Sequence, residues 1–189
     1  IPAFKEAIKE GADYGELDVR QTKDNVIVVT HDASLKEMTG QDINVRDLTY
    51  EELQKIPCIE VNGNKCTVPK LEDVINVCKG KIKLNIEIKT GNNDSEDFVS
   101  DVVKIIENTD FVDKCVVTSL DYRALRKVKE CNPKIKTGYI MAVAMGDFYD
   151  LPCVDFFRME TTFVNGRVVE RAHKLNREIH VWTVNDDDS

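Results

Sequence analysis

Short apolar segments of strand length recur along the chain, and most are separated by stretches with helical periodicity. In those stretches the apolar residues lie three and four positions apart, which is typical of an amphipathic helix. The predicted strands are residues 14–19, 84–88, 115–120, 137–141, 154–159 and 178–184. The predicted helices are residues 2–10, 70–78, 96–108, 121–130 and 167–175. This alternation predicts parallel βαβ units with right-handed crossovers.

One segment does not follow this alternation of strands and helices. Residues 24–73 form a longer excursion after the first predicted strand, with a short strand of their own at 26–30 and a helix at 50–55. We interpret residues 1–189 as a single domain, with an inserted loop or subdomain at about residues 33–69.

Two α/β architectures fit the alternation: a doubly wound sheet and a (β/α)₈ barrel. The sequence has neither G-x-G-x-x-G nor a Walker A loop, the usual markers of a nucleotide-binding sheet. Polar residues instead lie at the C-terminal ends of several separate predicted strands, where a barrel gathers its active site. These residues are Glu16, Asp18, Glu87, Lys89, Ser119 and Asn185. The pattern favours the (β/α)₈ (TIM) barrel.

The number of units and the two ends of the sequence bear on this barrel. The barrel has eight strands and typically about 250 residues, more than the units visible here. The chain opens on Ile1 without an initiator Met and closes on Asn185 and a short acidic run, directly after a strand-like segment. We therefore expect the first and last barrel strands to be missing from this chain.

The composition says more about the possible partners of the protein than about its fold. The formal net charge of −8 argues against a nucleic-acid partner and is compatible with a divalent cation. No apolar run reaches the roughly 18 residues of a membrane span. The six cysteines show no C-x-x-C pair, which favours free thiols, although Cys58 and Cys66 flank a turn where they could approach each other. The compartment, cytoplasmic or extracytoplasmic, stays open.

Glu16 and Asp18 are the first candidates for chemistry. Residues two apart in a strand point to the same face, so both carboxylates would enter the barrel. Two carboxylates on one buried face repel each other, and Ca²⁺ or Mg²⁺ would supply the compensating charge. The alternative is a solvent-facing strand end paired with Arg20 or Lys23.

The next barrel strand carries Glu87 and Lys89 on one face by the same alternation. Glu87 could complete a three-carboxylate site and Lys89 could bind an anionic oxygen, or the two could simply pair with each other. His31 lies at a predicted strand end and is a candidate general acid or base. Trp182 reads first as a core residue and second as an apolar wall of the pocket.

Several motifs, in order, closely resemble those of the glycerophosphodiester phosphodiesterases. The matching segments are residues 11–19, 22–24, 30–32, 69–72, 85–89, 118–119 and 182–185, so that the resemblance covers nearly the whole chain. Residues 138–160 look most like the branch whose catalytic domain follows a membrane-spanning region, which leaves a membrane-anchored parent open.

This resemblance implies metal-dependent hydrolysis of glycerophosphodiesters to glycerol 3-phosphate and an alcohol. It implies Glu16, Asp18 and Glu87 as metal ligands, with Ca²⁺ or Mg²⁺ as the cofactor, and His31 and Lys89 as catalytic residues. Lys89 would contact the phosphate. In the family the substrate's free glycerol hydroxyl is thought to attack phosphorus and form a cyclic phosphate.

The resemblance has one departure that bears on activity. The family's other catalytic histidine lies in a His-Arg-Gly motif on the first barrel strand, which this sequence lacks. Two alternatives therefore stay open: a related phospholipase that acts on lysophospholipid or sphingomyelin, and a non-catalytic barrel that binds a phosphodiester or lipid headgroup. The sequence does not indicate which alcohol is released or what the oligomeric state is.

Overall fold

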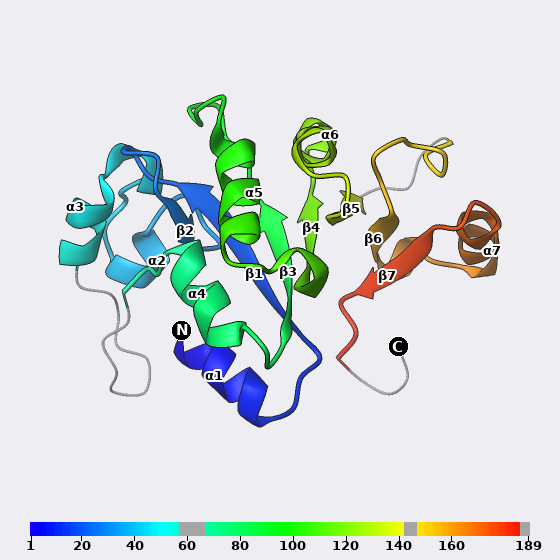
Figure 1. Cartoon of the computed structure of the whole chain (residues 1–189), viewed down its shortest axis with the longest axis horizontal. Coiled ribbons are helices and arrows are strands. Elements are labelled where there is room, and N and C mark those ends of the chain that lie inside the picture. The colour runs from blue at the N-terminus through cyan, green and yellow to red at the C-terminus, as the bar shows by residue number, and fades with distance from the viewer. Residues whose placement is uncertain (57–66, 142–146, 186–189) are drawn as a thin grey trace.

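A computed structural model describes residues 1–56, 67–141 and 147–185 of the chain (Figure 1). These residues form one seven-stranded sheet with the order β2-β1-β3-β4-β5-β6-β7. β2 pairs with β1 antiparallel, and every other neighbouring pair is parallel. The strands are β1 (Tyr14–Gln21), β2 (Ile27–Val29), β3 (Lys83–Ile88), β4 (Cys115–Ser119), β5 (Lys136–Met141), β6 (Phe156–Glu160) and β7 (Glu178–Trp182).

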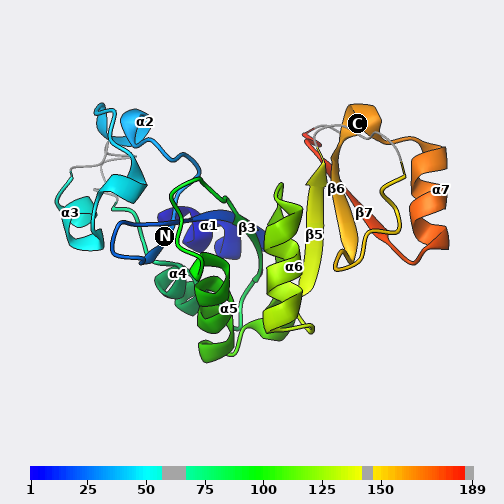
Figure 2. The same ribbon diagram turned by 90° about the horizontal axis from the view of Figure 1, so that it is seen from above.

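Helices cover one side of this sheet. The α-helices are α1 (Pro2–Lys9), α2 (Lys36–Thr39), α3 (Tyr50–Lys55), α4 (Leu71–Cys78), α5 (Phe98–Asn108), α6 (Tyr122–Cys131) and α7 (Gly166–Lys174). Three 3₁₀ helices, η1 (Val45–Asp47), η2 (Val112–Lys114) and η3 (Thr161–Phe163), join them in the described residues. Seen from above, the sheet curves, with α4, α5 and α6 along its outer side and α7 beyond β6 and β7 (Figure 2).

The core lies between the outer face of the sheet and these helices. Leu17, Ile86 and Val117 project from β1, β3 and β4 into a buried cluster with apolar residues of α4 and α5. A second buried cluster joins α6 and α7 to β5 and β6, around Phe157 and Leu125. Burial of each such side chain contributes about 1.5–3 kcal/mol. This outer core leaves the polar residues of alternate strand positions on the concave face.

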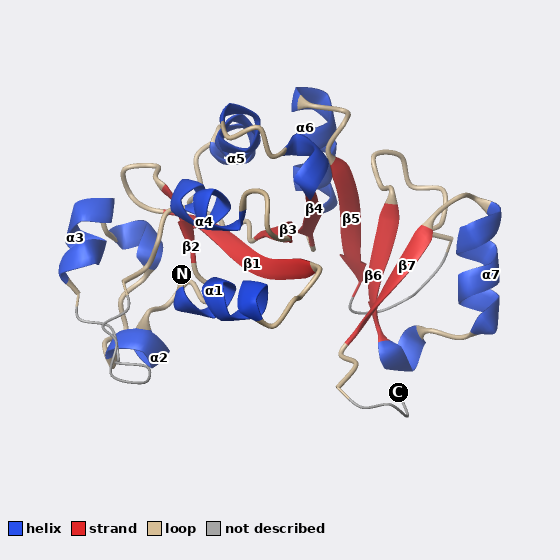
Figure 3. Ribbon diagram, turned by 60° about the horizontal axis from the view of Figure 1, so that its bottom comes forward, coloured by secondary structure: helices blue, strands red, loops and turns tan. Residues whose placement is uncertain are grey.

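The α/β class predicted from the sequence is confirmed, and the described residues form part of a (β/α) barrel. Figure 3 shows the strands following one another from β1 to β7 across the molecule. The predicted strands and helices are present, with small shifts of their ends. For example, β7 ends at Trp182, because its ladder partner β6 ends at Glu160, directly before η3.

The excursion after β1 packs around a small core of its own. Val28, Leu35, Val45, Leu53 and Val68 form this buried cluster. Helix α3 begins with a capping box, in which the Thr49 hydroxyl accepts from the Glu52 amide and the Glu52 carboxylate accepts from the Thr49 amide. The approach of Cys58 to Cys66 considered above lies outside the described residues.

The four cysteines in the described part of the chain, Cys78, Cys115, Cys131 and Cys153, are free thiols. Burial, which is the larger cause, and the charge of Asp113 raise the pKa of the Cys115 thiol to about 12.

None of the helices in the described ranges is long and apolar enough to cross a membrane.

Candidate active site

The parallel register of β1 and β3 brings three carboxylates together on the concave face. Asp18 pairs with Glu87, and Glu16 lies two residues before Asp18 on the same side of β1. One carboxylate oxygen from each of Glu16, Asp18 and Glu87 lies within 4.8 Å of the others. Asp18 and Glu87 are buried and Glu16 is exposed. The sequence-predicted acidic site is therefore one cluster in space.

Lys89 occupies the same cluster. Its Nζ lies 2.6 Å from Oε1 of Glu87 and 3.2 Å from Oδ1 of Asp18. Burial lowers the pKa of Lys89, but the hydrogen bond and charge of Glu87 and the charge of Asp18 outweigh it, so that the pKa is raised. Lys89 is thus held as a cation, the form that can bind an anionic oxygen. The simple Glu87–Lys89 pair considered from the sequence is present, but it forms part of a larger group of charges.

Arg158, on β6, is a site residue that the sequence did not indicate. Its Nη1 donates to Oε1 of Glu16 at 3.0 Å and lies 3.6 Å from Oε2 of Glu87. Glu16 therefore pairs with Arg158, and neither Arg20 nor Lys23 is its partner in the described structure. A charged residue within the buried run Phe156–Met159 was the available signal, since an arginine there needs a partner.

His31 lies two residues after β2, the strand that pairs with β1. The Thr30 amide donates to the Asp18 carbonyl, which places the residue before His31 directly beside Asp18 on β1. The His31 side chain is 72% exposed, and its Nδ1 lies 2.9 Å from Oδ1 of Asp32. The Arg20 side chain donates to the His31 carbonyl at 3.0 Å and holds this backbone in place. His31 is therefore accessible to a ligand and close in the fold to Asp18.

Trp182 lies at the end of β7, paired with Glu160 of β6. His180, two residues earlier, shares its face of the strand and stacks on Phe156 with ring centroids 4.1 Å apart. Trp182 is partly buried, and within the described residues its Nε1 has no hydrogen-bond partner. In the sheet, β7 neighbours β6, the strand that carries Arg158.

Ser119, which also ends a predicted strand, has a structural role. Its hydroxyl donates to the Ile88 carbonyl at 2.8 Å and accepts from the Asp121 amide at 3.1 Å. Both partners belong to the backbone, so Ser119 ties the end of β4 to the end of β3. The neighbouring Thr118 hydroxyl donates to Oδ1 of Asn85 at 2.9 Å on the concave face.

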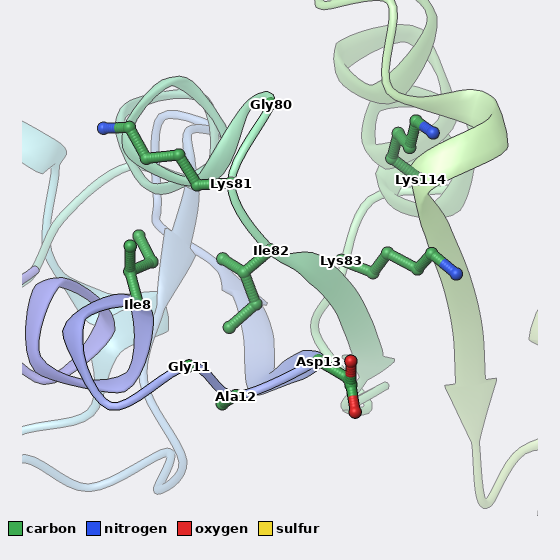
Figure 4. A pocket seen from close by; sticks show the side chains of 9 residues that line it. All are labelled: Ile8, Gly11, Ala12, Asp13, Gly80, Lys81, Ile82, Lys83 and Lys114. Carbon is green, nitrogen blue, oxygen red and sulfur yellow. The ribbon is translucent and has the colours of Figure 1, made fainter.

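The two ends of the sheet carry different cavities. A cavity of about 100 Å³ borders Lys89 beyond the C-terminal ends of β1 and β3, and Arg20 and Arg46 also line it. A larger pocket of about 390 Å³ lies at the opposite, N-terminal ends, where Lys83 and Lys114 lie on one side and Lys81 points away from them (Figure 4). Barrel enzymes carry their active sites at the C-terminal ends, so the acidic cluster is the candidate active site.

The acidic cluster suits a hard divalent cation. Its candidate ligands are carboxylate oxygens from two rigid neighbouring strands, the donor type that Ca²⁺ and Mg²⁺ prefer. Oδ1 of Asp18 is buried, and the Lys89 ammonium lies 3.2 Å from it. Three clustered carboxylates are costly to keep ionised without enough positive charge, and a divalent ion would add to the charge that Lys89 supplies.

A (β/α) barrel sheet with an acidic cluster at the C-terminal ends of its strands is typical of an enzyme, and comparison with known proteins shows which family the chain belongs to. Residues 1–189 match the Glycerophosphoryl diester phosphodiesterase family, and the chain belongs to this family. The Glycerophosphodiester phosphodiesterase of Caldanaerobacter subterraneus subsp. tengcongensis is 29% identical, over 97% of this chain and 79% of its own length.

Two other similarities are informative. The mouse Lysophospholipase D GDPD1 is 35% identical, over 64% of this chain and 44% of its own length. The structure of a phosphodiesterase from Oleispira antarctica, in complex with the product sn-glycerol-3-phosphate, superposes with a TM-score of 0.89. It is 21% identical and covers 99% of this chain and 79% of the other, which supports the fold. The family and enzyme class predicted from the sequence, a phosphoric diester hydrolase, are confirmed.

Proposed function

We propose that this protein hydrolyses glycerophosphodiesters to glycerol 3-phosphate and an alcohol, with Ca²⁺ or Mg²⁺ held by Glu16, Asp18 and Glu87. The observation that carries the proposal is the convergence of these three carboxylates beside Lys89 at the C-terminal ends of β1 and β3. Family membership supports the reaction, and the product complex of the Oleispira antarctica relative supports glycerol 3-phosphate as its product. Residues 1–189 would act as one catalytic domain, with residues 33–69 as an insertion.

Each candidate residue has a distinct role in this proposal. A cation bound to the carboxylates would polarise phosphate oxygens and lower the pKa of a nearby hydroxyl. Lys89 binds a phosphate oxygen through its ammonium group, which Glu87 and Asp18 keep protonated. His31, whose side chain is exposed, moves a proton between the reacting oxygens as general acid or base. Trp182 forms an apolar wall for the substrate.

The first test is product release by the purified protein. We expect glycerol 3-phosphate from glycerophosphocholine and glycerophosphoethanolamine with Mg²⁺ or Ca²⁺ present, and its loss when a chelator is added. Lysophosphatidylcholine in parallel reports on the phospholipase alternative. Release of lysophosphatidic acid from it, with none of the glycerol 3-phosphate reaction, would move the substrate class to lipids. A folded, metal-loaded protein that cleaves none of these substrates would contradict the proposal.

A further inference from the structure

Arg158 reaches across the concave face of the sheet. It projects from β6, whereas its two partners project from β1 and β3, with β4 and β5 between them in the sheet. The Arg158 side chain is 23% exposed, and its Nη1 atom contacts both carboxylates, of which Glu87 is also the nearest partner of Lys89. A guanidinium carries five N–H donors, so most of its donors have no carboxylate partner here.

The charges of this cluster suggest what Arg158 does. Three carboxylates stand against two cations, Lys89 and Arg158, which leaves one net negative charge. A divalent ion on the carboxylates would turn this into one net positive charge, which matches a phosphodiester monoanion. Without Arg158 the metal-loaded cluster would be neutral and would attract that anion less strongly.

We propose that Arg158 exchanges partners during ligand binding, an inference that rests on the proposed function. In the ion-free site its guanidinium pairs with Glu16 and Glu87, as observed. When these carboxylates ligate a cation, the guanidinium turns to the phosphate group and binds its oxygens. Arg158 thereby competes with the metal in the absence of phosphate and favours both ligands when they are present together.

Arginine suits this exchange better than lysine. Its planar fork can bind either a carboxylate or a phosphate, so a phosphate can replace the carboxylate that now accepts from Nη1 and can also accept from a second N–H of the fork. Lys89, a compact point charge on the opposite side of Glu87, has no such geometry. The two cations would therefore hold the phosphate from two sides, Lys89 from directly after β3 and Arg158 from β6.

The test is thermodynamic linkage, measured without turnover. Titration calorimetry would give the Kd of Mg²⁺ and of Ca²⁺ for the wild type and the variants Arg158→Gln and Arg158→Lys, each with and without saturating glycerol 3-phosphate. Arg126→Gln is the matched control, because Arg126 forms an exposed pair with Glu130 on α6. Linkage requires that the metal strengthen glycerol 3-phosphate binding by the same factor as the reverse.

We expect Arg158→Gln to bind the metal alone more tightly than the wild type, since its competitor is gone. We also expect the strengthening of metal binding by glycerol 3-phosphate to fall about tenfold, within the usual range of coupling between sites. Arg158→Lys should keep metal affinity near the wild-type value yet lose most of the phosphate affinity. Because it retains the charge, it serves as the test if Arg158→Gln does not fold.

Other outcomes would overturn the inference. Weaker metal binding in Arg158→Gln would mean that Arg158 positions the carboxylates as ligands. If the affinities and the coupling are unchanged and only the melting temperature falls, Arg158 stabilises the folded sheet and has no role in ligand binding. If the wild type binds neither cation, both the proposed function and the coupling are contradicted. If the wild type binds the cations and the coupling is unaltered in the Arg158 variants, only the role of Arg158 is contradicted.

Discussion

Glu87 is the most enclosed acid of the candidate site, with 7% of its side chain exposed, and both cations of the cluster contact it. We expect Glu87→Gln to weaken Mg²⁺ and Ca²⁺ binding strongly and to abolish turnover, because a neutral amide is a poor ligand and removes one negative charge. Two carboxylates would still balance two cations, so the variant should fold. Calorimetry and the glycerol 3-phosphate assay measure the two effects.

Glu130→Gln is a suitable control for this variant, because Glu130 is exposed on α6 and pairs only with Arg126 in the described structure. It should leave both measurements unchanged. Normal activity in Glu87→Gln would refute the three-carboxylate site.

His31 has a different expected signature, because its side chain is exposed and is not one of the clustered carboxylates. We expect His31→Ala to lower kcat by about 10²–10⁴, the usual contribution of a general acid or base, with metal affinity nearly intact. His173→Ala, an exposed position on α7, is the control. Loss of metal binding in His31→Ala would mean that the role assigned to His31 is wrong.

At the scale of elements, the pairing of β5 with β6 depends on Gly138. Gly138 pairs with Phe156 in the ladder between these strands. A Cβ at position 138 would lie 2.2 Å from the Phe156 ring. We expect Gly138→Ala to lower the free energy of unfolding by about 1–3 kcal/mol through overpacking. Chemical denaturation measures this change.

Gly166→Ala at the start of α7 is the matched control, because nothing lies within 4 Å of a Cβ there. It should be neutral or slightly stabilising, since alanine narrows the unfolded ensemble. Equal stability of the two variants would show that the Phe156 ring moves aside at little cost.

The elements themselves follow closely from the hydrophobic pattern, because each strand and helix has its own local periodicity. The pairing of Asp18 with Glu87 also follows from alternation, once the two strands are taken as neighbours. Arg158 could not be predicted in this way, since its partner Glu16 lies 142 residues away in the sequence. Only the curvature of the whole sheet brings β6 opposite β1, and no local pattern encodes that approach.

At the scale of the whole molecule, the candidate site joins distant parts of the sheet. Its carboxylates come from β1 and β3, and Arg158 reaches them from β6, so the site exists only in the folded sheet. A ligand that binds the folded state alone stabilises it by RT ln(1 + [L]/Kd). The unfolded chain holds these residues far apart, and we therefore expect metal binding to be coupled to global stability.

Removal of the metal tests this coupling. At about 100 times its Kd, Mg²⁺ or Ca²⁺ should add about 2.7 kcal/mol to the free energy of unfolding. For a chain of this size that corresponds to a rise in melting temperature of roughly 5–10 °C, reversed by chelator. Glu87→Gln should show almost no metal-dependent shift, whereas Glu130→Gln should shift like the wild type. A wild-type melting temperature that ignores both cations would mean that the carboxylates of β1 and β3 do not form a metal site.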